Sequence, residues 1–398
     1  MTPQQAQEAI DARVAPLPAE RQSLERCIGQ ILRQDIHAER DNPPFDRVCM
    51  DGIAVASNAF ARGVRRFAVQ ATQPAGSPAL TLSGADSAIE VMTGAMLPRG
   101  TDCVIPLEEY DLREGVVSLK NEASGDAFRN VQRRGSDSQP GVPMLTAGTR
   151  LGAPEIAVVA SAGLAEVSVS RQPRFMVIST GDELVEPGEP IAEHQVRRSN
   201  AYAVVAALRG RGFQQVANDH ILDDEPMLQE RLARHLSQHD ALILSGGVSK
   251  GKFDLVPKVL KSLRVEEVFY QVAQRPGMPM WFGVGPAGQA VFGLPGNPVS
   301  TLVCLIRYVV PAMSLAMGAR RATQELVAIA SPVNSRRSAA YFLPVAVRYD
   351  ERGRALADPR FPRGSGDFLA LTEADGFVEL PPQAEEFPAG YVASLYRW

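Results

Sequence analysis

The sequence predicts a multidomain α/β protein built around an open, mostly parallel sheet with helices on both faces. From Arg174 to about residue 320, short β-rich runs alternate with helical patterns, which is typical of such a sheet. The chain has 398 residues, more than one ordinary domain contains, and 45% of them are hydrophobic. Short strands broken by Gly and Pro precede and follow the alternating region, and these predict smaller β domains.

Four parts are therefore expected along the chain, and no internal repeat is visible. They are a helical and linker scaffold formed by residues 1–45 with 137–172, a β-rich insert domain at 46–136, the α/β domain at 173–320, and a C-terminal β-barrel domain at 321–398.

The scaffold should begin with two amphipathic helices, at residues 3–14 and 23–34. Ser23 can cap the second helix, because its hydroxyl can accept a hydrogen bond from a free backbone N–H. Ile28 and the other apolar residues of that segment would then share one face. A further helix is expected in the run PEIAVVASAGL at 154–164.

The insert domain is expected to consist of short strands, including RFAVQA, AIEVMTG, CVIPLE and GVVSLK. Before them, Asp51-Gly52 is a turn signal that precedes the apolar run 53–55. Thr93 stands at a strand end, where the simplest interpretation is that its hydroxyl bonds its own backbone.

Strands and helices of the α/β domain can be placed by pattern. Strands are expected at 175–180, 213–216, 241–244 and 269–273 and in the runs MWFGVG and QAVFGLPG. Helices are expected from Ser199 or Asn200 to Gly212, from an Asp224 cap to Leu236, and from Pro298 through VSTLVCLIRYVVPAM. Gly283, Gly285 and Gly288 spell GxGxxG, but no helix follows them, so a hairpin turn is expected.

In sheets of this kind, ligands bind beyond the carboxyl ends of the strands. Four polar loops should therefore meet at one rim, namely 180–183, 223–224, 245–254 and 293–298. Asp182 and Asp224 have a simpler alternative as helix caps, and for Asp224 we favour the cap.

The loop after the strand at 241–244 carries the strongest chemical signal. Gly246 and Gly247 permit backbone angles that let several N–H groups point at one anion. A hydroxyl, two lysines and one acid follow, contributed by Ser249, Lys250, Lys252 and Asp254. Phosphate donors beside one carboxylate indicate an oxyanion held together with a divalent cation.

Simpler interpretations of this loop stay open. GGVSKGK resembles a P-loop, but Phe253 stands where a P-loop needs Ser or Thr to hold Mg²⁺. Asp254 can be only the cap of the helix that follows, and the lysines can be a solvated face.

Composition excludes several classes of function. A net charge of −4 and a pI near 5.9 argue against a nucleic-acid binder held by bulk charge. The four cysteines are scattered, without CxxC, which argues against a zinc site or a disulfide framework. The N-terminus has no apolar signal region, and Arg307 interrupts the most apolar stretch, near 298–317. We expect a cytoplasmic protein with no membrane span.

The last segment, from about Ala322, changes character. ELVAIAS, YFLPVAVRY, GFVELP and YVASLYRW are short strands separated by Gly- and Pro-rich turns, which predicts a small β barrel or sandwich.

Taken together, the motifs resemble the MoeA family of molybdopterin molybdenumtransferases, which is related to the C-terminal part of gephyrin. They run in order through essentially the whole chain: PPFDRVCMDGIAV, VMTGAMLPRGTDCVIPLEE, NVQRRGSD, STGDELVEPG, SGGVSKGKFD, QRPGMP and GLPGNPVS. The resemblance implies an elongated homodimer in which the α/β molybdopterin-binding domain of one subunit faces the β insert of the other.

The resemblance also implies the reaction. Molybdate is inserted into adenylated molybdopterin and AMP is released, with Mg²⁺ as the usual cation. By similarity the positions that count are Asp51, Thr93, Glu183, Asp223, Asp254, Arg275 and Ser365. The pterin phosphate would be held by Ser245, Gly246, Gly247, Ser249, Lys250 and Lys252, with Pro295, Gly296 and Asn297 beside them.

The resemblance further implies that Asp223 and Asp254 hold the cation across the pyrophosphate, and that Glu183 orders a water or a second cation.

The chain departs from the family pattern at two places. Arg275 and Met278 stand where Lys-Pro-Gly-Lys-Pro is usual, and Lys250 stands where a neutral residue is common. The positive charges of the pocket therefore stand at other sequence positions than is usual in the family. This difference affects which residue contacts molybdate and whether the protein prefers molybdate to tungstate.

Two alternatives remain. One is a molybdopterin adenylyltransferase-type activity, although those single-domain relatives lack the segments around Asp51 and Thr93. The other is a pterin-binding scaffold without catalysis, although the acids expected for catalysis are all present. An adenylyltransferase is also the expected supplier of substrate.

Overall fold

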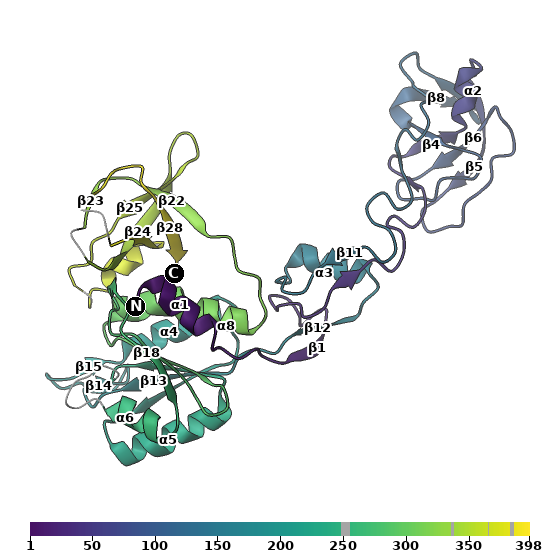
Figure 1. Cartoon of the computed structure of the whole chain (residues 1–398). Coiled ribbons are helices and arrows are strands. Elements are labelled where there is room, and N and C mark those ends of the chain that lie inside the picture. The colour runs from purple at the N-terminus through teal and green to yellow at the C-terminus, as the bar shows by residue number, and fades with distance from the viewer. Residues whose placement is uncertain (248–254, 336–337, 365, 383–385) are drawn as a thin grey trace. The chain divides into compact units, whose positions relative to one another are not determined.

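The computed structural model describes residues 1–247, 255–335, 338–364, 366–382 and 386–398 (Figure 1). They form two compact units. The first comprises Met1–Gln34, Ala147–Gly152 and Glu166–Trp398, and the second comprises Asp35–Thr146 and Ala153–Ala165. The predicted multidomain α/β class is confirmed, while the exact four-part boundaries stay a prediction.

The first unit contains a six-stranded sheet in the order β16–β13–β17–β21–β20–β18. The strands are β13 (Phe175–Thr180), β16 (Val216–Ile221), β17 (Ala241–Ser245), β18 (Glu266–Tyr270), β20 (Trp281–Val284) and β21 (Ala290–Leu294). The first four in spatial order are parallel, and β20 is antiparallel to both of its neighbours, β21 and β18. The chain builds β16 on one side of β13 and then crosses to β17 on the other, so the order of strands reverses between β13 and β17.

Both faces of this sheet are buried, which explains the continuous apolar runs. Phe175 and Val177 face one core together with α4 (Ser199–Gly210). Met176 and Ile178 face the other with α5 (Glu225–Gln238) and α6 (Leu255–Ser262). Alternation along β13 therefore divides the domain into two hydrophobic layers.

The long helix expected after Pro298 is present and lies in the first of these cores. It consists of α7 (Pro298–Cys304), a π-helical turn η2 (Leu305–Val309) and α8 (Val310–Ala316). The π turn was not predicted, and it accompanies Pro311, which has no N–H to donate to the preceding turn. By length and composition the helix could cross a membrane, but 72% of it is buried inside the protein.

The predicted C-terminal barrel is confirmed. β24 (Ala340–Tyr349), β25 (Ala355–Pro359), β22 (Glu325–Ile329), β28 (Val392–Arg397) and β26 (Gly376–Leu380) pair in that order, and β26 closes the ring on β24. β19 (Gln274–Arg275) adds to β24 from outside, and β23 (Val333–Asn334) pairs with β27 (Glu386–Phe387). The short helix η3 (Leu369–Glu373) precedes β26.

The second unit contains the expected small β domain. Its sheet has the order β7–β4–β6–β5–β9–β8, made of β4 (Gly52–Val55), β5 (Arg66–Gln73), β6 (Ser87–Val91), β7 (Cys103–Pro106), β8 (Tyr110–Arg113) and β9 (Val116–Leu119). Two short pairs flank it, β3 (Arg47–Val48) with β10 (Val131–Gln132) and β2 (Ile36–His37) with β11 (Pro143–Leu145). The helices are α2 (Ser57–Ala61), η1 (Leu107–Glu109) and α3 (Ala153–Ser161).

Two predicted elements were wrong. The segment 23–34 is not a helix, because Ser23 ends β1 (Ala19–Ser23), which pairs with β12 (Glu166–Ser170), and turns follow. Gly29 has φ +77° and Ile28 is 67% exposed, so no helical apolar face forms. The strand expected at 213–216 instead begins at Val216.

Two other predictions are confirmed. The GxGxxG segment is the predicted hairpin, between β20 and β21, and the first predicted helix is α1 (Pro3–Asp11).

Candidate functional site

A cavity of about 450 Å³ lies where the order of strands reverses, at the carboxyl ends of β13 and β17. Five of the predicted site residues line it, namely Glu183, Ser245, Gly246, Gly296 and Asn297. The other lining residues are Ser179, Thr180, Leu184, Val196, Arg197, Arg198, Ser199, Asn200, Pro298 and Phe368. Three of the four predicted rim loops, at 180–183, 245–254 and 293–298, contribute residues to this cavity, whereas 223–224 does not line it.

The glycine loop after β17 runs close to the end of β13. Gly246 and Gly247 have φ of +97° and +62°, which side chains rarely adopt. A Cβ at Gly246 would lie 2.8 Å from the Thr180 carbonyl oxygen, and one at Gly247 would lie 2.6 Å from Thr180 Oγ1. Both the backbone angle and the space therefore require glycine at these two positions.

Two buried hydroxyls in the cavity wall have no hydrogen-bond partner in the part of the chain that the structure describes. Ser179 is 2% exposed and Thr180 is 3% exposed, and neither Oγ nor Oγ1 forms a hydrogen bond with any residue that the structure describes. A buried hydroxyl without a partner costs about 1–3 kcal/mol, so such groups need an explanation. A ligand oxygen in the adjoining cavity would supply the missing partner.

Asn200, at the start of α4, fixes the loops around this cavity. Its Nδ2 donates to Ser245 Oγ at 3.0 Å, to the Gly296 carbonyl at 2.7 Å and to Thr301 Oγ1 at 3.3 Å. Thr301 Oγ1 in turn donates to the Pro295 carbonyl at 2.6 Å. The loops after β17 and β21 are thereby held against the same helix end.

A buried arginine stands beside this helix end. Arg198 is 8% exposed, forms a 2.8 Å ion pair with Glu186 and also donates to Asn218. Its guanidinium lies 5.8 Å from the ring centre of Tyr202, and its Nε is buried without a hydrogen-bond partner among the described residues. Arg198 is thus a cationic group in the cavity wall, and the roles predicted for Lys250 and Lys252 stay predictions.

The acids at this rim behave differently from one another. Glu183 and Asp223 are both exposed. Asp182 is not a helix cap, because its Oδ1 accepts the backbone N–H of Asp223 at 3.0 Å and joins two rim loops. Asp224 is the predicted cap, since it accepts the Met227 N–H of α5 at 2.8 Å.

Several predicted residues lie outside the described part of the chain, namely Ser249, Lys250, Lys252, Asp254 and Ser365. Their roles therefore stay predictions. Within the described part, no group of three His, Cys, Asp or Glu side chains could hold a metal ion. The predicted set of Asp223, Asp254 and Glu183 depends on Asp254, so that set also stays a prediction.

In the second unit, Asp51 and Thr93 are brought together. The Thr93 hydroxyl donates to Asp51 Oδ1 at 2.7 Å, and the Thr93 backbone N–H donates to the same oxygen at 2.6 Å. These two hydrogen bonds, the hydroxyl first, hold the pKa of Asp51 below its usual value. The simpler interpretation of Thr93, bonding its own backbone, was wrong.

Arg275 has a different setting from the cavity residues. It is exposed on β19, which pairs with Ala340 and Tyr341 of the barrel. It is not among the residues lining the cavity, and Met278 nearby is 44% exposed. Its proposed contact with an oxyanion stays a prediction.

Comparison with known proteins now identifies the family. Three family descriptions match in order: the MoeA N-terminal region (domain I and II) at residues 1–163, a probable molybdopterin binding domain at 176–314, and the MoeA C-terminal region (domain IV) at 327–398. A molybdopterin molybdenumtransferase from Synechocystis sp. is 38% identical over 371 residues, 93% of each chain. The chain belongs to the MoeA family. It is therefore a transferase of molybdenum cofactor biosynthesis.

More distant members agree with this assignment. A molybdopterin molybdenumtransferase from Staphylococcus epidermidis is 29% identical over 94% of this chain and 90% of its own. The solved structure of the molybdopterin biosynthesis MoeA protein from Pyrococcus horikosii is 30% identical, with a TM-score of 0.80 over 100% of this chain and 98% of that one.

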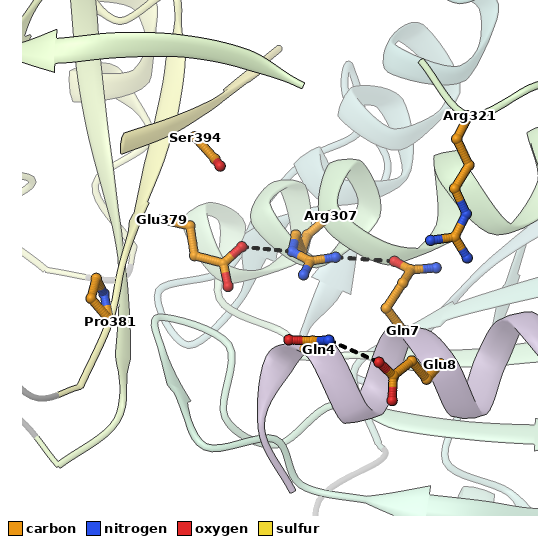
Figure 2. Close-up of a pocket in the computed structure, with 8 residues that line it drawn as sticks. All are labelled: Gln4, Gln7, Glu8, Arg307, Arg321, Glu379, Pro381 and Ser394. Carbon is orange, nitrogen blue, oxygen red and sulfur yellow. Dashed lines mark hydrogen bonds and ion pairs between the residues drawn. The ribbon is translucent and has the colours of Figure 1, made fainter. Parts of the chain in front are cut away.

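A second pocket of this MoeA-family chain, of about 500 Å³, contains none of the predicted site residues (Figure 2). It lies among α1, the long helix and the barrel, and Arg307 is at its centre. Arg307 Nε donates to Glu379 Oε2 at 3.0 Å and its Nη1 donates to Gln7 Oε1 at 3.1 Å. Tyr396 also donates to Glu379, at 2.9 Å. The arginine that interrupts the apolar helix is thus paired within the protein.

Ten of the residues that line the cavity were not predicted as site residues, and four of them are instructive, namely Thr180, Arg198, Asn200 and Phe368. A local signal existed for two of them, because the pair Arg197-Arg198 and Asn200 stand at the start of a predicted helix next to the ligand rim. Thr180 lay in a rim loop without being singled out. Phe368 comes from the segment before β26 and carries no local signal at all.

Proposed function

We propose that this MoeA-family chain inserts molybdenum from molybdate into adenylated molybdopterin and releases AMP in a Mg²⁺-dependent reaction. The observation that carries the proposal is the cavity at the reversal of strand order, where two buried hydroxyls without a partner among the described residues adjoin a glycine loop. The family relationship supports the class of transfer, and the cavity supports a phosphate-bearing substrate.

The phosphate end of the substrate would sit between the glycine loop and the ends of α4 and α7. Backbone N–H groups near Gly246 and the hydroxyls of Ser179 and Thr180 would donate to its oxygens. Cleavage of the pyrophosphate places additional negative charge on these oxygens. Donors already held in position by Asn200 would stabilise that charge without rearrangement.

Magnesium would be held by carboxylates at the rim. Glu183 and Asp223 are exposed there, and carboxylate oxygen is the ligand that Mg²⁺ prefers. Asp254 would complete the set. When bound, the ion neutralises phosphate charge. Glu183 and Asp223 offer oxygen donors of the kind that this cation prefers, and the proposed set is complete only with Asp254.

The remaining roles concern assembly and molybdate. We propose a cytoplasmic homodimer in which Asp51 and Thr93 serve the cavity of the partner subunit, with an adenylyltransferase as the supplier of substrate. Asp51 suits this role because Thr93 keeps its carboxylate charged and oriented. Arg275 and Ser365 would contact molybdate, since a guanidinium can bridge paired oxygens of a tetrahedral oxyanion.

The decisive experiment mixes the purified protein with adenylated molybdopterin, molybdate and Mg²⁺ and measures AMP by chromatography. We expect AMP release that needs all three components. AMP release without molybdate incorporation, or none at all, would contradict the proposal. Incorporation of AMP from ATP into molybdopterin would instead indicate an adenylyltransferase, and tight pterin binding without turnover would indicate a scaffold.

The molybdate contact has its own test. Arg275→Ala should raise the molybdate concentration needed for half-maximal AMP release about ten- to a hundredfold, because a charge-assisted contact is lost. Met278→Lys, which restores the usual family residue, should leave this requirement unchanged or lower it. An unchanged molybdate dependence in Arg275→Ala would move the oxyanion contact elsewhere.

A further inference from the structure

A fully buried glutamine lies beneath the turn that follows β19. We call this turn, residues 276–279, the Pro-Gly turn. Gln274 and Arg275 are the two residues of β19, so their side chains point to opposite faces of the strand. Gln274 is 0% exposed, whereas Arg275 is exposed. The burial of Gln274 therefore fixes the outward direction of Arg275.

The amide of Gln274 connects the Pro-Gly turn to the long helix. Its Nε2 donates to the Gly277 carbonyl at 3.2 Å and to the Pro276 carbonyl at 3.4 Å. Because a carbonyl can only accept, the amide nitrogen must face the turn and the amide oxygen must face away from it. Tyr308 donates its hydroxyl to that oxygen. The tyrosine therefore determines how the glutamine is held against the turn.

The π-helical turn η2 supplies this tyrosine. Tyr308 is buried in the core that also contains Val272 and Met280, which lie on either side of the Pro-Gly turn. Cys304, just before η2, donates its thiol to the Gly277 carbonyl at 3.7 Å. A Cβ at Gly277 would lie 2.7 Å from Cys304 Sγ, so the turn packs directly on the helix. Such π-helical turns are frequently found at functional sites.

Backbone hydrogen bonds close the same segment at its base. The Met278 carbonyl accepts the Val272 N–H at 3.0 Å and the Met280 N–H at 2.8 Å. These bonds join the two ends of the segment, while the Gln274 amide bonds its middle. The position of Arg275 thus depends on a buried amide as well as on the backbone.

We propose that Gln274, supported by Tyr308, is a positioning residue that holds Arg275 in the orientation needed for molybdate. This inference rests on the proposed function, which assigns the molybdate contact to Arg275. A guanidinium bridges two oxygens of an oxyanion only in a narrow range of directions, so a small displacement of the turn weakens the contact. The role also explains why an amide lies in an apolar core. An apolar side chain of similar size would fill the space but would leave the carbonyls of the turn without this donor.

A matched pair of tyrosine substitutions tests the inference. Tyr308→Phe removes the support of Gln274 and leaves every residue of the turn unchanged. The molybdate concentration for half-maximal AMP release should rise about three- to tenfold, while KM for adenylated molybdopterin stays the same. Tyr396→Phe is the control, because it also removes one hydroxyl donor, to Glu379, and should leave the molybdate requirement unchanged. A purely structural role would lower stability without separating the two substrates.

Removing the amide itself should have a larger effect. Gln274→Met keeps a similar volume and should raise the molybdate requirement about tenfold or more, up to the effect of Arg275→Ala. Gln172→Met is the control, because Gln172 is 7% exposed and its amide donates to Gln30 at 2.8 Å. In an Arg275→Ala background, neither Gln274→Met nor Tyr308→Phe should raise the requirement further. Additional increases in that background would overturn the inference, and Tyr308→Phe covers the case in which Gln274→Met does not fold.

Hydrogen exchange of the segment provides a readout that does not depend on activity. The Val272 and Met280 amides should exchange faster in Tyr308→Phe and Gln274→Met than in the wild type, and at the wild-type rate in both controls. Unchanged exchange, or faster exchange with an unchanged molybdate requirement, would overturn the inference alone, since the wild-type protein still releases AMP. No AMP release by the wild-type protein would instead reject the proposed function and, with it, the molybdate role of the turn.

Discussion

The main cavity and the Arg307 pocket are nearly equal in size, and both are lined by arginines and carboxylates. They differ in how their polar atoms are satisfied. In the pocket of Figure 2, Arg307 is paired with Glu379 and Gln7. In the main cavity, Ser179 and Thr180 keep buried hydroxyls without a partner among the described residues.

This difference separates a structural contact from a binding site. Hydrogen bonds within the fold already offset the desolvation penalty of paired buried groups. For buried groups without such a bond, a bound ligand can supply the hydrogen bond that offsets the penalty. Cavity volume alone would rank the two equally. We therefore expect substitutions in the main cavity to change activity, and substitutions in the Arg307 pocket to change stability.

The largest effect is expected at Asp254, the predicted metal ligand that follows the two glycines in the sequence. Asp254→Asn should reduce Mg²⁺-dependent AMP release by a factor of about 1,000 or more, because an amide cannot replace a charged metal ligand. Since Asn still caps a helix, the melting temperature should stay close to that of the wild type. Asp224→Asn is the matched control, because Asp224 is a cap of α5 and should keep its activity. Near wild-type turnover of Asp254→Asn would reduce Asp254 to a cap.

The second prediction tests the unpartnered hydroxyl directly. Thr180→Val keeps the shape of the side chain and should lower kcat/KM for AMP release about ten- to a hundredfold. Its free energy of unfolding should be unchanged or rise by about 1 kcal/mol, because a buried hydroxyl without a partner is removed. Thr323→Val, at an exposed position, serves as control. A loss of stability without a loss of activity would show that Thr180 has a structural partner.

The third prediction concerns the paired pocket. Arg307→Met should lower the free energy of unfolding by about 1–3 kcal/mol, measured by denaturant titration, because it leaves Glu379 with less compensation. Arg307→Met combined with Glu379→Gln should recover part of that loss. The exposed pair Arg397 and Glu325 provides the control, since Arg397→Met should cost less than about 1 kcal/mol. A large decrease in kcat for the folded Arg307→Met protein would break the contrast between the two pockets.

The smallest effect is expected at Asp51. Thr93→Val removes the hydroxyl donor but keeps the backbone N–H, so the pKa of Asp51 should rise toward its usual value. Because the pKa is depressed in the folded protein, its contribution to stability is present at neutral pH and is lost only as the pH falls through the acid range. Carboxyl NMR titration of the two proteins checks this. An unchanged pKa would mean that the hydroxyl is not the main cause.

Alternating strands and helices, together with the rule on carboxyl ends, were sufficient to predict the sheet and the position of the cavity. These signals are local, since β13 and β17 are continuous apolar runs and the glycines follow immediately. The barrel was predictable for the same reason. What pattern reasoning could not supply was any interaction that depends on a distant partner.

The segment 23–34 illustrates this limit. Its apolar spacing fits a helix, yet Ile31 and Leu32 are buried through single bridges to Arg150 and Val169. Phe368 is similar, because it reaches the cavity from a segment more than a hundred residues after β17. The hydrophobic pattern of the surrounding sequence indicates neither of these contacts.

The close approach of the glycine loop to Thr180 also limits how this chain can drift during evolution. Any side chain at Gly246 or Gly247 would meet atoms less than 3 Å away. By contrast, Gly210, at the end of α4, has no described atom within 4 Å of an added Cβ. In a library that samples every amino acid at every position, Gly246 and Gly247 should stay invariant among active clones while Gly210 varies freely. We therefore expect glycines of the same domain to be under different selective constraint.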